Sequence, residues 1–276
     1  MQKEKIMSQD NNKRWGLLAI TVVITLTLIL VVAGLIAQQK ESPADNPSAA
    51  SPTPATTTSE ISKGKEGEWL APTADVFGRA IKVPANGAGN PLGSAAGGDT
   101  TSCSATAGNV TIQATHGVQT MWTGNAGPST VNDEGVPTGY ARTAEGAMIS
   151  GFNTVSLIYA GGAISGSAAQ YGAAGSDAAG FAERLKATPP EQVDTTKDRP
   201  SPSAYKVTSC SDTQVVGDLA LPTPTDAQGN PDNPTWLVIR LSMVWENGGW
   251  KWQYEGVPQP IEDEITSLSG WTEWQY

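Results

Sequence analysis

An uncharged apolar run divides this chain into parts that fold in different environments. Residues 16–37 contain no charged side chain and read GLLAITVVITLTLILVVAGLIA. At about 1.5 Å rise per residue, a helix of this length crosses the ~30 Å hydrocarbon core of a membrane. Lys3, Lys5, Lys13 and Arg14 precede the run, and this excess of basic residues predicts a cytoplasmic N-terminus.

We therefore expect a single-pass protein of the cell membrane. The expected layout is a cytoplasmic tail at 1–15, a transmembrane helix at 16–37, a disordered linker rich in Pro, Ser and Thr at 38–67, and an extracellular domain at 68–276. A cleaved signal peptide is the alternative, although its apolar region is normally only about 7–15 residues long.

Charge and metal-binding residues exclude several classes of ligand. The formal net charge of −10 at pH 7 repels polyanions, so no nucleic acid partner is expected. Two cysteines and one histidine do not form the spacing of a zinc site, so we expect neither a metal nor a cofactor.

The two cysteines, Cys103 and Cys210, fall in the expected extracellular domain. Thiols tend to oxidise outside the membrane, which favours an intramolecular disulfide between them. Two unpaired buried thiols, or bridges between chains, are the alternatives.

The segment after residue 140 predicts an amphipathic helix. Thr143 is a plausible N-cap, and Gly161 and Gly162 are expected to stop the helix. Large apolar residues recur at intervals of four, three and four and form the expected core face: Met148, Phe152, Val155 and Tyr159.

Strand signals dominate the last third of the chain. Segments 203–211, 213–222 and 236–245 and the second arm of a hairpin predict about four antiparallel strands. Segment 68–84 is expected to wrap onto the domain as an extended arm. Helices that precede these strands indicate an α+β class, with helices packed on a curved antiparallel sheet.

The hairpin has a defined register. Residues 247–248 are Asn-Gly, a strong signal for a two-residue turn. This turn pairs Trp245 with Trp250 and Met243 with Trp252, and all four lie on one apolar face.

The same register places Arg240 opposite Glu255 on the other face. The aromatic residues of the region either form the core or grip a ligand at a pocket mouth, and the apolar face favours the core. These residues are Trp236, Trp245, Trp250, Trp252 and Tyr254.

No catalytic set is evident, so we expect a protein that is not an enzyme. The single histidine, His116, has no nucleophile motif beside it. Acid–base chemistry would need His116, Asp218 and Arg142 to line one pocket.

Two stretches resemble known protein groups. The hairpin region 236–254, after its helices, resembles the nuclear-transport-factor-2-like (cystatin-like) α+β cone. Residues 139–153, GYARTAEGAMISGFN, and the ending SLSGW resemble a group of uncharacterised membrane-anchored actinobacterial proteins, often met among mobile-element and conjugation genes. The cone fold also appears in bitopic assembly factors of type IV secretion and conjugation machines, which act as scaffolds.

The resemblance implies a non-enzymatic, membrane-anchored extracellular domain that binds proteins or acts as a scaffold in a conjugation or cell-envelope transfer complex. Its expected partners are the membrane and proteins of the cell envelope, and a homo-oligomer remains open. The alternative is a sensor domain that binds a small molecule or glycan in an aromatic cone pocket.

Overall fold

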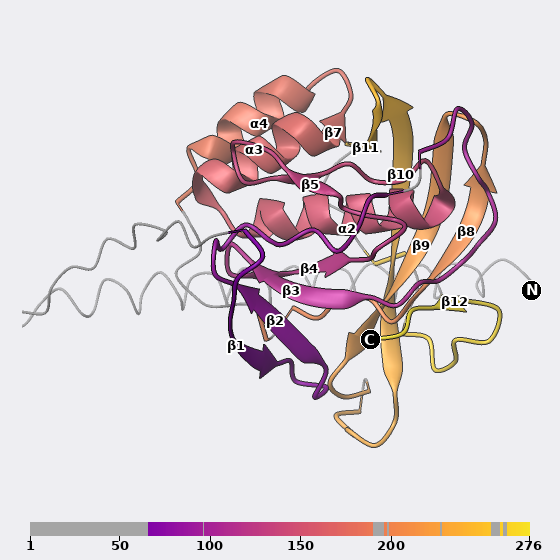
Figure 1. The fold of residues 1–276 in the computed structure, drawn as a ribbon. Coiled ribbons are helices and arrows are strands. Elements are labelled where there is room, and N and C mark those ends of the chain that lie inside the picture. Colours follow the sequence, from indigo (N-terminus) through magenta and orange to yellow (C-terminus); the bar gives the residue numbers. More distant parts are fainter. Residues whose placement is uncertain are drawn as a thin grey trace, which may run out of the picture. The chain divides into compact units, whose positions relative to one another are not determined.

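The computed structural model describes residues 66–95, 97–189, 196–197, 199–226, 228–254, 260–261 and 264–276 (Figure 1). The expected tail, the expected transmembrane helix and nearly all of the expected linker lie outside these residues. Within the described part of the chain, no helix is long and apolar enough to cross a membrane.

The larger sheet contains the four strands that the sequence predicts. Its order is β12 (Thr272–Glu273), β8 (Ala204–Cys210), β9 (Gln214–Thr223), β10 (Thr235–Glu246), β11 (Gly249–Gln253) and β7 (Ala173–Ala174). The neighbours from β8 to β11 are antiparallel, whereas β7 adds to β11 in parallel. The domain is therefore α+β, with a sheet that is mixed at one edge.

The hairpin of β10 and β11 has the predicted register. Trp245 pairs with Trp250 and Met243 pairs with Trp252. The turn residues Asn247 and Gly248 have φ values of 54° and 78°, as a two-residue hairpin turn requires.

Arg240 has a partner that the sequence did not predict. Its Nε and Nη2 lie 2.6 and 2.9 Å from the two carboxylate oxygens of Asp218, across the β9–β10 pair. Glu255, the expected partner, lies outside the described residues.

A second sheet replaces the expected extended arm. Its order is β1 (Trp69–Ala74), β2 (Ala80–Pro84), β3 (Thr111–Thr115) and β4 (Val118–Trp122). Segment 68–84 folds back as a hairpin, and β2 then runs parallel to β3 with Ile81 opposite Ile112. Both isoleucines are buried, so the pairing removes apolar side chains from water that a loose arm would expose. A two-stranded ladder of β5 (Thr130–Val131) and β6 (Pro137–Thr138) follows in the chain.

Helix α2 (Ala144–Tyr159) lies between the two sheets and contacts both (Figure 1). Thr143 caps it as predicted, because its side chain accepts a hydrogen bond from the Gly146 N–H. The helix is buried on nearly every side, not on one stripe as expected. On the side facing β4, Asn153 exchanges hydrogen bonds with the backbone of Met121, so polar side chains are buried there with partners.

A glycine sets the distance between α2 and the larger sheet. A Cβ atom at Gly151 would lie 2.7 Å from Met243 Sδ and 2.8 Å from Leu241 Cδ1. The absence of a side chain allows the helix to approach β10 closely. This approach packs the middle of α2 against the second half of β10, at Leu241 and Met243.

Two shorter helices follow, α3 (Gly162–Gly172) and α4 (Ala178–Lys186). Asp177 occupies the cap position of α4 as expected, but its side chain makes no capping bond. It accepts a 2.7 Å hydrogen bond from Arg184 instead.

Candidate functional site

Two aromatic residues of the hairpin belong to the core. Trp250 and Trp252 are buried. Trp250 Nε1 donates a 2.8 Å hydrogen bond to the carbonyl oxygen of Ala141, and Trp252 meets the ring of Phe181 edge-on at 6.4 Å between centroids. Buried indoles of this kind are structural groups, so these two residues do not form an open platform for a ligand.

Trp245 and Tyr254 pack against the same core and are partly buried. Trp245 meets Trp250 edge-on at 5.2 Å, and Tyr254 stacks on Phe181 at 3.9 Å. The Arg142 guanidinium lies 5.2 Å from the centre of the Trp245 ring. These contacts connect the hairpin to α4 and to the segment before α2.

Trp236 is separate from the other four aromatic residues. It lies near the start of β10, on the strand face opposite Leu237 and the core. Its Nε1 donates a 3.0 Å hydrogen bond to Ser203 Oγ, and its ring lines a pocket.

The helix residues divide between the core and a pocket. Met148, Phe152 and Val155 are buried. The expectation for Tyr159 is wrong, because 41% of this residue is exposed. Tyr159 is the last residue of α2, and the Arg199 guanidinium lies 4.7 Å from the centre of its ring at the molecular surface.

The predicted disulfide between Cys103 and Cys210 is confirmed, with 5.8 Å between the Cα atoms. It holds the loop before β3 to the end of β8. Beside it, Thr101 N–H donates a 2.8 Å hydrogen bond to Asp212, and Arg142 Nη2 donates one of 3.0 Å to the Asp212 carbonyl oxygen. The disulfide and the Thr101 hydrogen bond therefore hold the loop before β3 against the end of β8 and the residues that follow it.

Glu145 is a buried carboxyl group in the first turn of α2. Its Oε1 accepts hydrogen bonds from the Gly108 N–H at 2.7 Å and from Trp274 Nε1 at 3.2 Å. Burial raises its pKa above the ordinary value, and the bonds from Gly108, Trp274 and Thr106 oppose this shift. These three hydrogen bonds all come from its own domain, which indicates a structural role.

The three residues considered for acid–base chemistry have separate surroundings. His116 lies in the turn between β3 and β4, and burial lowers its pKa. Asp218 pairs with Arg240, and Arg142 contacts Asp212. The fold does not bring the three residues to one pocket.

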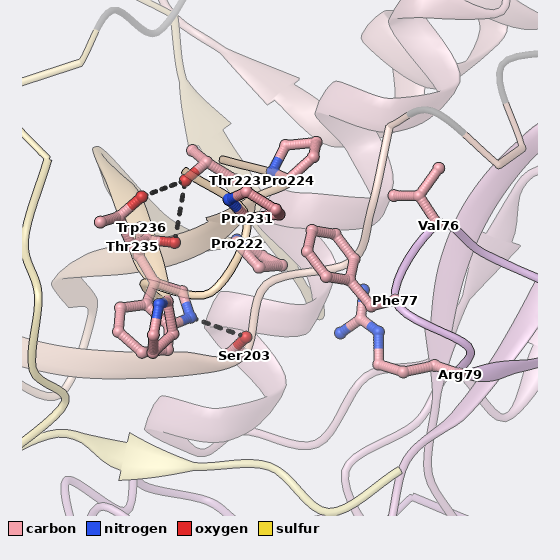
Figure 2. A pocket seen from close by; sticks show the side chains of 11 residues that line it. Val76, Phe77, Arg79, Ser203, Pro222, Thr223, Pro224, Pro231, Thr235 and Trp236 are labelled. Atoms are coloured by element: carbon pink, nitrogen blue, oxygen red, sulfur yellow. Dashed lines mark hydrogen bonds between the residues drawn. The ribbon is translucent and has the colours of Figure 1, made fainter. Parts of the chain in front are cut away.

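A pocket of about 420 Å³ opens at the end of the β9–β10 pair (Figure 2). We call it the proline pocket. Its apolar walls come from the β1–β2 turn, from the β9–β10 end and from the loop that joins these two strands. The wall residues are Val76, Phe77, Pro222, Pro224, Pro231, Pro234 and Trp236.

Few polar side chains line the proline pocket. Thr223 and Thr235 hydrogen-bond to each other through their hydroxyl groups, as Figure 2 shows. Ser203 Oγ accepts from Trp236, which leaves its O–H able to donate. Arg79 is the charged residue of the lining.

The charge of Arg79 is compensated locally. Its Nε donates a 2.7 Å hydrogen bond to the buried Asp75, and its Nη2 donates one of 2.9 Å to the Ser201 carbonyl oxygen. Its guanidinium also lies 4.6 Å from the centre of the Tyr276 ring. The guanidinium is therefore held in place by its own domain, and its charge is offset by Asp75.

A second pocket, of about 390 Å³, lies between α2 and the inner face of the larger sheet. We call it the helix pocket. Its lining includes Phe152, Val155 and Tyr159 from α2 and Leu221, Leu237 and Ile239 from the strands. Strand β10 has 12 residues, or roughly 40 Å at about 3.3 Å each, whereas the 16-residue α2 extends about 24 Å. The last turn of α2 therefore leaves the first apolar residues of β10 incompletely covered.

The two pockets share one wall. Pro222, Thr223 and Pro224 line both of them, so the β9–β10 end separates the pockets as a thin two-sided ribbon. The surrounding rim is apolar and accessible, with 52% of Val76 and 37% of Phe77 exposed. This ribbon end is the candidate functional site.

Sequence reasoning found only part of this site. It selected Trp236 but assigned Phe77 to an extended arm and placed Pro222 at the end of the strand predicted at 213–222. The repeated prolines beside a tryptophan were the available signal, because proline in a loop forms a rigid apolar surface.

Comparison with known proteins finds a protein family that this chain matches. Neither the curated proteins nor the solved structures contain a match to this chain. A family model described as a domain of unknown function, DUF8175, matches residues 71–273. This range includes the larger sheet, the second sheet except the first two residues of β1, all three described helices and the ribbon end. The chain therefore belongs to the DUF8175 family.

Proposed function

We propose that this chain is a non-enzymatic, single-pass membrane protein whose extracellular domain binds a protein partner in the cell envelope. The observation that supports this best is the ribbon end, where two largely apolar pockets meet. Accessible apolar surface of this kind is typical of sites that receive another molecule. Here it occurs on a chain whose formal net charge is −10.

The proposed anchor is the apolar run at 16–37, with the basic residues before it in the cytoplasm. The linker at 38–67 then holds the domain away from the membrane surface. A component of a conjugation or envelope-transfer complex is the class of partner that the resemblance suggests.

We also infer that the domain is a variant of the cystatin-like cone. In support, the four antiparallel strands β8 to β11 carry the 16-residue helix α2 on their apolar face. The additional sheet β1–β4 on the far side of α2 is then an elaboration of that core.

Position-specific photocrosslinking in intact cells tests the proposed binding function. A photoreactive residue replaces Val76 at the rim of the proline pocket in the tagged full-length chain. A second chain carries the same residue at Glu183, an exposed position on α4, as the matched control.

We expect mass spectrometry to identify an envelope protein that is captured from position 76 and not from position 183. Capture at equal levels from both positions, or no capture from either, contradicts binding through the ribbon end.

The helix pocket favours a second candidate function, the binding of an apolar small molecule. Its walls are mainly apolar side chains, and its volume of about 390 Å³ falls within the ligand-pocket range of roughly 300–1,000 Å³. Solvent extraction of the purified full-length chain, followed by mass spectrometry, checks this candidate. Absence of any stoichiometric apolar compound from the extract counts against it.

A further inference from the structure

The proline pocket has the surfaces that recognise extended proline-rich peptides. Figure 2 shows Phe77 and Trp236 on opposite sides of the pocket, with proline rings from the β9–β10 end along one edge. Aromatic side chains that line a groove accept the rings of a polyproline II segment by flat apolar contact. The indole of Trp236 is already oriented by its 3.0 Å hydrogen bond to Ser203, so little side-chain entropy is lost on binding.

The hydrogen-bonding groups of the pocket also suit such a segment. A proline-rich segment offers carbonyl oxygens as acceptors, and its prolines have no N–H to donate. Ser203 retains a donor, because its oxygen accepts from Trp236 while its O–H remains available. Thr223 and Thr235 bond to each other and place no competing demand on a ligand. The pocket therefore combines apolar walls with a donor at its inner edge.

The charge balance disfavours an anionic ligand. Arg79 is the charged lining residue, and the buried Asp75 compensates it at 2.7 Å. The acidic chain as a whole, with its net charge of −10, repels anions. A neutral, apolar segment that is rich in hydrogen-bond acceptors needs no free cation in the pocket and is not repelled by the negative net charge.

We propose that the proline pocket binds a proline-rich segment of the partner protein in the polyproline II conformation. This inference rests on the proposed function, because it assigns a sequence class to the part of the partner that is bound. The ring of Phe77 is the main contact, since it is accessible and extends from the β1–β2 turn over the pocket.

Calorimetric titration of the purified full-length chain with decaproline tests the proposal. A decapeptide of alternating glycine and serine, which has similar length but no polyproline II preference, is the control ligand. The variant Phe77→Ala removes the accessible ring. Tyr159→Ala removes a ring of similar exposure from the neighbouring helix pocket and is the matched control variant. Circular dichroism and the melting temperature establish that both variants fold.

We expect decaproline to bind and the glycine–serine peptide not to bind. The change Phe77→Ala should weaken binding about tenfold, the scale of one lost hot-spot contact. The change Tyr159→Ala should leave the affinity within about twofold. Absence of decaproline binding, equal binding of both peptides, or equal losses in both variants overturns the inference.

The two proposals fail in different ways. A partner that is captured from position 76 but contains no proline-rich segment contradicts this inference and leaves the proposed function intact. Decaproline binding without capture of any protein in cells contradicts the proposed function and leaves the peptide preference of the pocket intact.

Discussion

A single buried carboxyl group connects three distant segments of this domain. Glu145 lies in the first turn of α2, Gly108 lies in the loop before β3, and Trp274 lies two residues before Tyr276. The ring of Trp274 also stacks on Tyr205 of β8, with 4.8 Å between centroids. Ionisation of Glu145 therefore acts at a point where the helix, a loop and the C-terminal segment meet.

The change Glu145→Gln should make stability less dependent on pH. Burial raises the folded-state pKa of Glu145 above its ordinary value of 4.5. Its contribution to the free energy of unfolding is thus complete below about pH 4 and is lost as pH rises through the folded-state pKa. Glutamine stays neutral, and its oxygen can still accept from Gly108 and Trp274. Between pH 4 and 7, the free energy of unfolding of the variant should therefore rise relative to that of the wild type. The expected difference is about 1.4 kcal/mol for each unit by which the pKa of Glu145 is raised.

Urea denaturation at several pH values measures this difference. Glu273→Gln is the control, because it removes the same charge from an exposed residue one position before Trp274. A wild-type protein that becomes more stable than Glu145→Gln as pH rises contradicts a raised pKa.

Two tryptophans on the same strand have different environments. Trp236 and Trp245 lie on β10, nine positions apart. They point to opposite faces of the strand, because successive side chains alternate between the faces. Trp245 lies on the face that α2 covers and packs against the core. Trp236 lies on the other face, where it lines the proline pocket together with residues of the β1–β2 turn.

At the scale of the element, the β10–β11 turn determines the register of the aromatic hairpin. Gly248 has a φ of +78°, and nothing lies within 4 Å of the position that a Cβ would occupy there. Any cost of a side chain at this position is therefore backbone strain and not a clash.

The change Gly248→Ala should lower the free energy of unfolding by about 1–2 kcal/mol, the usual cost of a left-handed conformation for an L-residue. Gly249→Ala is the matched control, because its Cβ also meets nothing within 4 Å and its backbone is outside the left-handed region. We expect that control to change stability by no more than about 0.5 kcal/mol. Equal urea midpoints for the two variants contradict the assigned turn geometry.

The lengths of the elements explain where the pockets lie. The 16-residue α2 covers the second half of β10, where Gly151 allows close packing on Leu241 and Met243. The first half of β10 extends past the helix, and its apolar side chains face the helix pocket on one side of the strand. A strand that is longer than the helix packed on it leaves some apolar side chains uncovered, and no special local sequence is needed for this.

At the scale of the whole molecule, the disulfide connects the first and second halves of the domain. Cys103 and Cys210 are separated by 107 residues. A bridge that closes a loop of this size restricts the unfolded chain and stabilises the fold by about 4–5 kcal/mol in the chain-entropy model.

The double variant Cys103→Ser with Cys210→Ser should therefore lose several kcal/mol of unfolding free energy, of the order of 4. Denaturation of the wild type with and without a reductant provides the comparison. The double variant is its own control, since the reductant should leave it unchanged. Full reduction of the wild-type thiols without loss of stability contradicts a stabilising bridge.

Local sequence was sufficient for much of the larger sheet and for α2. The Asn-Gly turn and the alternation of apolar residues specified the register of Trp245 with Trp250, because the side-chain period of a strand allows no one-residue slip without mixing the faces. Thr143 determined the start of α2, because a capping hydroxyl satisfies a backbone N–H at a known offset. With only two cysteines, the disulfide had a single intramolecular pairing.

Only the tertiary structure decided the second sheet, the full burial of α2 and the position of the candidate site. The pairing of β2 with β3 joins segments that are separated by a glycine-rich loop, and no local period encodes such a contact. That sheet buried Asn153 and its neighbours, which the helical pattern alone places in water. The ribbon end likewise combines Phe77, Ser203 and Trp236 from three distant segments, because a pocket forms where the chain brings surfaces together and leaves them incompletely covered.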